Sequence, residues 1–303
     1  MKSLWAPSCI SVKKWASQFQ QKKTLPPSTN LVFLGIGIKS VEHELFIPPE
    51  KAQAILKDLK DFLSKRTQRV KKWQSILGKL CPLTQVISPG RAYLSSVYAS
   101  LSGILSQHGS RYRTIGSEAR EDLEVWKSFF EDTSPNKNFR MLSPSPPTME
   151  VYTDASKTIG YGAVCGRQWF VGEWPQEWKS FNIATLELFP ILAALRTWEP
   201  RAENGTVHIH TDNKAVATVI NRLYAKDKGL RQLVKPLALH CLSKNIKVQA
   251  YHIEGINNIG PDLLSRGRIN DFLKRFPHMH STPAVVPPTA LPNKMYFAHL
   301  TNK

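Results

Sequence analysis

Five short segments in the second half of the chain have the pattern of β-strands, and alternation of hydrophobic and polar residues is clearest in TVHIHT (206–211). They read MEVYTD (149–154), GYGAVCG (160–166), QWFVGEW (168–174), TVHIHT (206–211) and IKVQAYHI (246–253). Turns that contain Gly join the first three, as in an antiparallel meander. Helical periodicity separates the others, so the pattern predicts an α/β domain with a mixed five-stranded sheet and flanking helices.

The segments between these strands repeat their hydrophobic residues every three to four positions, as amphipathic helices do. IATLELFPILAALRTW (183–198) places five hydrophobic residues near one face: Ile183, Leu186, Ile191, Leu195 and Trp198. Pro190 is expected to weaken or bend the first turns of this helix. Further helices are predicted at 212–223, 229–245 and 255–266, and Asp212 or Asn213 is the expected N-cap of the first of these.

A cluster of Ser and Pro marks a domain boundary. NKNFRMLSPSPPT (136–148) cannot continue a helix and suits an extended linker. The predicted organisation has five parts: an N-terminal segment (1–24), a mainly helical domain (25–135), the linker (136–148), the α/β domain (149–276) and a Pro-rich flexible tail (277–303).

The charge of the chain indicates a polyanionic partner. The formal net charge is +18, and residues 1–147 carry 22 Lys and Arg against 11 Asp and Glu, so the excess is not confined to one half. Nucleic acid is the natural partner of such a chain, and a basic protein that is merely soluble is the alternative. No apolar run is long enough for a signal peptide or a membrane span, and the four cysteines lie far apart. We therefore expect reduced thiols and an intracellular, cytoplasmic or nuclear protein that does not bind membranes.

A basic segment in the first domain is a candidate nucleic-acid contact. LSKRTQRVKKWQSILGKL (63–80) reads as a helix whose apolar face includes Val70, Trp73, Ile76, Leu77 and Leu80. The basic residues around this face are Lys65, Arg66, Arg69, Lys71, Lys72 and Lys79, and Arg91 follows in SPGRAYLSSVY (88–98). Such side chains follow phosphates and give sequence-independent, salt-sensitive binding, whereas a solvated charged face is the alternative.

Four acidic residues stand at the ends or beginnings of the predicted elements. Asp154 ends the first strand, Glu187 lies in the first helix, Asp212 follows the fourth strand and Asp262 opens the last helix. If the first and fourth strands are neighbours, the four carboxylates converge, and carboxylate oxygens suit Mg²⁺ or Mn²⁺. Two such ions activate a water and stabilise the leaving oxygen of a phosphodiester. Taken singly, each acid also reads as a turn, helix-cap or solvated residue.

At these residues the chain resembles a known family. YTDAS, NIATLELFPILAAL, HTDN and HIEGINNIGPDLLSR resemble the ribonuclease H domain of retrotransposon reverse transcriptases, closest to the DIRS-type elements. LVFLGIGI and WQSILGKLCPLTQVISPGRAYLSSVY in the first half resemble the segment after the polymerase palm and the thumb and connection. The resemblance covers residues 25–270 and implies a ribonuclease H-like fold preceded by a thumb and connection-like domain.

The resemblance also implies roles. Asp154 would bridge two Mg²⁺ ions, with Mn²⁺ as a substitute, and Glu187, Asp212 and Asp262 would complete their coordination. The RNA strand of an RNA–DNA hybrid would be cut, and Ser156, Thr185 and Asn213 would contact the 2′-hydroxyl that distinguishes RNA from DNA. No Tyr-x-Asp-Asp stretch is present, so we expect no DNA synthesis, and we expect possible partners among other retroelement segments.

Two departures from the family pattern concern the last loop. Ile256 follows Gly255 where cellular relatives have a mobile His, and Pro261 stands before Asp262. Two hypotheses stay open: an active hybrid-specific ribonuclease, which the complete set of four acids supports, and a non-catalytic nucleic-acid-binding remnant of a reverse transcriptase, which the missing palm motif supports.

Overall fold

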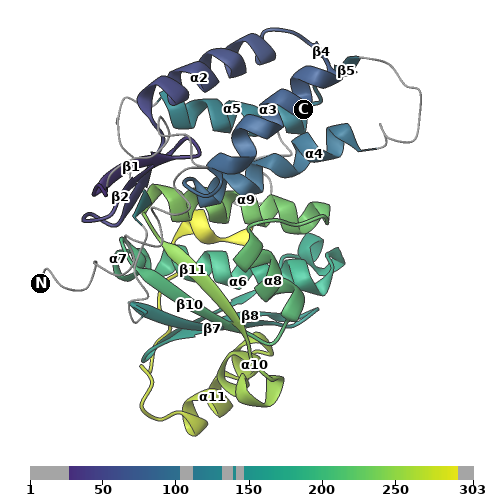
Figure 1. Ribbon diagram of the computed structural model, residues 1–303. Helices are drawn as coiled ribbons and strands as arrows, with labels where there is room; N and C mark the ends of the chain where they lie inside the picture. Colours follow the sequence, from purple (N-terminus) through teal and green to yellow (C-terminus); the bar gives the residue numbers. More distant parts are fainter. Residues whose placement is uncertain (1–26, 103–111, 132–138, 141–146, 293–303) are drawn as a thin grey trace, which may run out of the picture.

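The computed structural model describes residues 27–102, 112–131, 139–140 and 147–292. Figure 1 shows two parts stacked on each other: a mainly helical part above, and a β-sheet with helices on both faces below. This arrangement agrees with the mainly helical first half and the α/β second half predicted from the sequence.

The central sheet has five strands in the order β11-β10-β7-β8-β9. Their bounds are β7 Met149–Ala155, β8 Gly160–Cys165, β9 Gln168–Glu173, β10 Thr206–Thr211 and β11 Lys247–His252. Strands β7, β8 and β9 form an antiparallel meander, while β10 is parallel to both β7 and β11. The predicted fold class, a mixed five-stranded sheet with flanking helices, is confirmed. Because β7 and β10 are neighbours, the acids at their ends lie side by side.

Alternation along β7 and β10 sends one set of side chains to each face of the sheet. Val151 and Ile209 are completely buried beneath the helices α6, α8 and α9. Tyr152 faces the other way, toward α10, and packs on a smaller cluster that includes Leu264 and Phe272. The helices of this part are α6 Ile183–Thr197, α7 Glu199–Ala202, α8 Lys214–Arg222, α9 Lys228–Ser243, α10 Ile259–Ser265 and α11 Ile269–Arg275, with the short 3-10 helices η5 Gln176–Ser180, η6 Gly255–Asn257 and η7 Pro288–Ala290.

Helix α6 differs from the one-sided helix that the sequence predicted. It is buried on all sides from Thr185 to Leu195, because the sheet lies on one side and α9 on another, whereas Ile183 is 41% exposed. The helix runs through Pro190 without a break. Asn213, the second of the two candidate caps, is the N-cap of α8, and its Oδ1 accepts hydrogen bonds from the backbone N–H groups of Ala215 and Val216.

The helical part is built from short strands and packed helices. Its elements are β1 Asn30–Phe33, β2 Ile36–Lys39, β3 Glu44–Phe46, α2 Pro49–Leu63, β4 Thr67–Arg69, α3 Val70–Leu83, η3 Ser88–Leu94, α4 Ser95–Leu101, β5 Tyr112–Thr114 and α5 Ser117–Glu131. The single helix predicted over 63–80 is wrong, because β4 pairs with β5 and divides it. The buried positions Trp73, Ile76 and Leu80 confirm the predicted apolar face of α3, whereas Val70 is only half-buried.

The two parts share a continuous hydrophobic core and a buried ion pair. The carboxylate of Asp122 on α5 is 1% exposed; it accepts a hydrogen bond from Ser96 and pairs with Lys235 of α9 at 2.5 Å. Burial raises the pKa of Asp122, although the Lys235 ammonium opposes this shift. Nearby, the Tyr93 hydroxyl donates to the Lys235 carbonyl oxygen.

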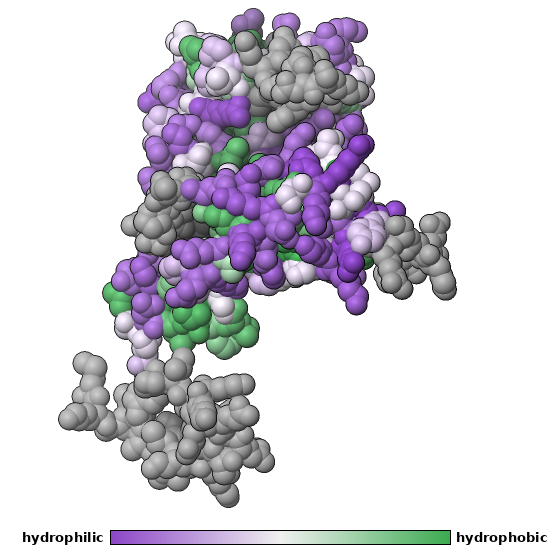
Figure 2. Space-filling view, turned by 90° about the horizontal axis from the view of Figure 1, so that it is seen from above, coloured by the Kyte–Doolittle hydropathy of each residue, from purple (hydrophilic) through white to green (hydrophobic). Residues whose placement is uncertain are grey.

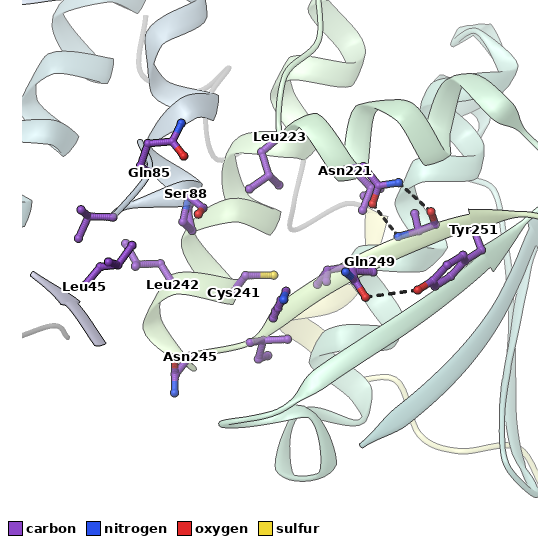
Figure 3. Close-up of a pocket in the computed structure, with 17 residues that line it drawn as sticks. Leu45, Gln85, Ser88, Asn221, Leu223, Cys241, Leu242, Asn245, Gln249 and Tyr251 are labelled. Carbon is purple, nitrogen blue, oxygen red and sulfur yellow. Dashed lines mark hydrogen bonds between the residues drawn. The ribbon is translucent and has the colours of Figure 1, made fainter. Parts of the chain in front are cut away.

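A cavity of about 680 Å³ lies between the helical part and the edge strand β11 (Figure 3). Leu45 and Ser88 of the helical part line one side, and Gln249 and Tyr251 of β11 line the other. Asn221 forms two hydrogen bonds with the backbone of Ala250, one to the carbonyl oxygen and one from the N–H. The middle of this sheet edge is therefore already paired and does not offer its backbone to a further strand.

Two predicted boundary segments are more ordered than expected. Within the predicted linker, β6 (Phe139–Arg140) pairs with β3, while residues 136–138 and 141–146 lie outside the described residues. The predicted flexibility of the tail is wrong for residues 277–292. Ala284 donates its N–H to the Trp169 carbonyl, Arg196 donates to the Thr289 carbonyl at 2.5 Å, and Ala290 is fully buried. Residues 293–303 lie outside the described part.

No helix among the described residues is both long and apolar enough to cross a bilayer. Cys81, Cys165 and Cys241 are free thiols, as predicted, and Cys9 lies outside the described part.

Candidate active site

Asp154 is a buried carboxylate at the end of β7. It is 8% exposed, and Ser265 of α10 donates its hydroxyl hydrogen to Oδ2 at 2.5 Å. The pKa of Asp154 is raised to about 6, first by burial, with the Asp212 and Asp262 charges adding to the shift and the Ser265 hydrogen bond opposing it. The fold therefore holds this carboxylate in place at a cost in its solvation.

Glu187 approaches the same point from the opposite face of the sheet, on the first turns of α6. It is 9% exposed, and its Oε2 finds no hydrogen-bond partner in the described part of the chain. Its pKa is raised to about 8 by burial and then by the charges of Asp212 and Asp154, while a hydrogen bond with the Asn213 side chain lowers it. A buried carboxylate oxygen without a partner is costly and calls for a cation or a proton.

Asp212 and Asp262 complete the group from β10 and α10. Asp212 directly follows β10, and a Cβ built on Gly255 would lie 3.3 Å from its Oδ2, so the loop after β11 packs closely there. His252 lies 3.1 Å from the Asp212 carbonyl oxygen and is exposed. Asp262 lies in the first turn of α10, whose N-cap is Asn258, so Asp262 is not the helix cap. Its Oδ1 accepts a hydrogen bond from Arg266 at 2.7 Å.

The donor set of these four residues fits a hard divalent cation. All four supply carboxylate oxygens, and Glu187 contributes a buried oxygen that lacks a partner within the described ranges. Among the described residues, however, no three His, Cys, Asp or Glu side chains are gathered closely enough to hold a metal ion. The charge of Asp212 contributes to the raised pKa of both Asp154 and Glu187, while Ser265 binds the carboxylate of Asp154 and Arg266 binds that of Asp262.

The residues proposed to contact the 2′-hydroxyl differ in accessibility. Thr185 is 1% exposed and lies against Gly229 of α9, so its hydroxyl is not accessible to a substrate and the predicted contact from this residue is wrong for this structure. Ser156 uses its hydroxyl in the β7–β8 turn, where it donates to the Ser265 carbonyl at 2.8 Å. Asn213 caps α8 and hydrogen bonds Glu187, which places it beside the carboxylates but leaves little of its hydrogen-bonding capacity unused.

Ser265 and Arg266 are functional candidates that the sequence analysis missed. Both follow Asp262, at the i+3 and i+4 positions of one helical turn, in PDLLSR. This spacing places them on the same face of α10 as the acid. The spacing could therefore have indicated that both side chains lie near Asp262 in the site.

The basic residues of the helical part do not form one stripe. Lys65 and Arg66 precede β4, whereas Lys71 and Lys72 lie on α3. Figure 2 shows a largely hydrophilic outer surface over this part, interrupted by hydrophobic patches. Ion pairs and hydrogen bonds engage several of the charges: Lys72 with Asp61, Lys79 with Asp58 and Arg69 with Tyr112. Arg91 is exposed, and together with Arg222 and Tyr224 it lines a second cavity between the helical part and the part that contains the five-stranded sheet.

No protein-family model matches the chain, and no curated protein matches it. Among solved structures, a foamy viral protease-reverse transcriptase in complex with an RNA/DNA hybrid aligns with 84% of this chain at 16% identity and a TM-score of 0.35. This chain spans 33%, about a third, of that protein.

Two ribonucleases H1 align with smaller shares of the chain. The ribonuclease H1 of the halophilic archaeon Halobacterium salinarum NRC-1 covers 41% of this chain and 98% of its own, at 15% identity and a TM-score of 0.32. LC11-RNase H1, isolated from compost by a metagenomic approach, covers 42% of this chain and 99% of its own length, at 16% identity and a TM-score of 0.31. TM-scores this low decide neither fold nor activity, and the fold class rests on the strand order of the five-stranded sheet.

Proposed function

We propose that this chain is a ribonuclease H-type endonuclease that hydrolyses the RNA strand of RNA–DNA hybrids with divalent cations, and that it derives from the reverse transcriptase of a DIRS-type retroelement. The observation that carries the proposal is that Asp154 and Asp212 lie at neighbouring strand ends, where their charges act on Glu187, whose buried Oε2 has no hydrogen-bond partner among the described residues. The net charge of +18 supports a nucleic-acid substrate.

Asp154, Glu187, Asp212 and Asp262 would hold Mg²⁺ or Mn²⁺. Such ions, when bound, activate a water and stabilise the leaving oxygen of the phosphodiester. The protein contributes position: Ser265 fixes one oxygen of Asp154, and Asn213 holds Glu187. Asp262 must exchange Arg266 for the cation, and this exchange costs little, because an ion pair whose side chains are 57% and 40% exposed contributes roughly 0–1 kcal/mol.

A panel of labelled substrates tests the proposal. Purified protein would be incubated with an RNA–DNA hybrid, single-stranded RNA, duplex RNA and duplex DNA of one sequence, in Mg²⁺, in Mn²⁺ and in EDTA. We expect cutting of the RNA strand of the hybrid alone, and only with a divalent cation. Salt-sensitive binding of the hybrid without cutting in either metal would contradict the proposal and would favour the non-catalytic nucleic-acid-binding protein.

A further inference from the structure

Three aromatic rings lie side by side in a row across neighbouring strands of the sheet, two residues before the carboxylates along β7 and β10. Tyr152 of β7, His210 of β10 and Tyr251 of β11 are register neighbours on the face opposite to α6. The Tyr152 and His210 rings stack with centroids 4.3 Å apart and 13° between their planes, and His210 and Tyr251 are 5.7 Å apart at 23°. Since Tyr152 and His210 precede Asp154 and Asp212 by two residues, the row lies roughly 7 Å from those acids along the strands.

The row is open to solvent at its β11 end. Tyr251 is 42% exposed, and Figure 3 shows it at the outer edge of the sheet beside Gln249. The inner ring faces are occupied by neighbouring rings. A further ring can therefore extend the stack only at one of its two ends.

A cavity of about 600 Å³ adjoins the other end of the row. Tyr152 lines this cavity together with Val164 of β8 and Gly166, which directly follows that strand. Val164 is the register partner of Tyr152 on β8, and β8 and β10 flank β7 on opposite sides, so part of the cavity lies on the side of Tyr152 away from His210. Its volume falls within the range of small-ligand sites, roughly 300–1,000 Å³.

The lining of this cavity combines an apolar floor with a basic rim. Ile259, Phe272, Phe276 and Met279 belong to the floor, and Arg201, Arg275 and His278 are the basic residues. Glu150 is the one acidic residue among its described lining residues. Arg275 is exposed and has no ion pair within the described ranges, so its guanidinium is available to an anion.

We propose that this cavity binds a nucleotide, with the base stacked on Tyr152 as the next ring of the row and the phosphate on Arg275 and Arg201. An aromatic base would pack on the apolar lining and stack on the last ring of the row. A guanidinium group forms two parallel hydrogen bonds to phosphate oxygens. The nucleotide is either a free mononucleotide or one residue of a single strand. The site is separate from the carboxylates and does not depend on their activity.

Binding in EDTA tests the proposal without cleavage. The probes are AMP and UMP, measured by calorimetry, and short fluorescein-labelled single strands of DNA and RNA, measured by anisotropy. Arg275→Gln is the main variant, and Lys274→Gln is its matched control, since Lys274 is a neighbouring exposed cation of α11 outside the cavity lining. Tyr152→Leu removes the stacking ring, and Tyr152→Phe keeps it.

We expect Arg275→Gln and Tyr152→Leu each to weaken binding roughly 5- to 100-fold, the range for a lost base stack or a charged hydrogen bond. Lys274→Gln and Tyr152→Phe should stay within about twofold of the wild type. Mononucleotide binding would identify a free nucleotide as the ligand, and binding of oligonucleotides alone would identify a strand. Equal losses in Lys274→Gln and Arg275→Gln, or wild-type binding by Arg275→Gln, would overturn the proposal even if Tyr152→Leu did not fold.

Discussion

Glu187→Gln is expected to abolish hybrid cleavage while making the protein more stable without divalent cations. Loss of a metal-binding carboxylate removes several kcal/mol of transition-state stabilisation, which corresponds to a rate reduction of roughly 1,000-fold or more. The gain in stability follows from the pKa of Glu187, which burial and the neighbouring acids raise to about 8. Gln has nearly the same shape and carries no charge that must be buried.

The sign of the pH dependence follows from the same shift. A carboxyl group whose pKa is higher in the folded than in the unfolded protein loses stability as the pH rises from the unfolded value toward the folded value. In EDTA, Glu187→Gln should therefore raise the free energy of unfolding by roughly 1–4 kcal/mol at about pH 8, and the gain should vanish near pH 4.

Denaturant unfolding at several pH values and single-turnover cleavage of a hybrid measure the two effects. Glu177→Gln is the matched control, because Glu177 is an exposed glutamate in η5. It should change neither quantity. A Glu187→Gln protein that cuts at the wild-type rate, or that is less stable than the wild type at pH 8 in EDTA, would contradict the proposed role.

Lys235→Met is expected to lower the free energy of unfolding by roughly 3–5 kcal/mol near neutral pH. The substitution leaves the Asp122 carboxylate 1% exposed without its cationic partner. Ser96 still donates a hydrogen bond, which compensates only part of the lost solvation. Because burial already raises the pKa of Asp122, the loss should be largest at high pH and should shrink as Asp122 becomes protonated on acidification.

A double-mutant cycle separates charge from packing. Asp122→Asn/Lys235→Met removes both charges, so we expect it to recover most of the stability lost in Lys235→Met. Lys228→Met, at the exposed first residue of α9, is the control for the loss of a lysine from that helix. If the double variant were as unstable as Lys235→Met, the buried charge would not be the cause of the loss.

The sheet could be predicted from the sequence because β7 and β10 alternate hydrophobic and polar residues and because Gly-containing turns mark the meander of β7, β8 and β9. In TVHIHT the inward Val207 and Ile209 are completely buried, and His208 and His210 face the other side. The same period places Asp154 and Asp212 at adjacent strand ends. In contrast, β4 has only three residues, and the helical periodicity of its neighbours hid it.

Long-range contacts could not be read from local patterns. The Pro-rich tail looked flexible, yet a backbone hydrogen bond from Ala284 to Trp169 and a side-chain hydrogen bond from Arg196 to the Thr289 carbonyl hold residues 277–292 on the sheet and α6. Thr185 looked like a polar residue near the site, but the packing of α9 on α6 buries it. The row that Tyr152 begins depends on strand order, which no single segment specifies.

The measurement that tests the central claim most directly is cleavage of one labelled RNA–DNA hybrid by the wild type, Asp154→Asn and Asp212→Asn in Mg²⁺ and in EDTA. Circular dichroism of each protein would show that the fold is kept. The site predicts cutting of the RNA strand by the wild type in Mg²⁺ only, and none by either variant. Cutting that persists in EDTA or in both variants would contradict a divalent-cation site at these carboxylates.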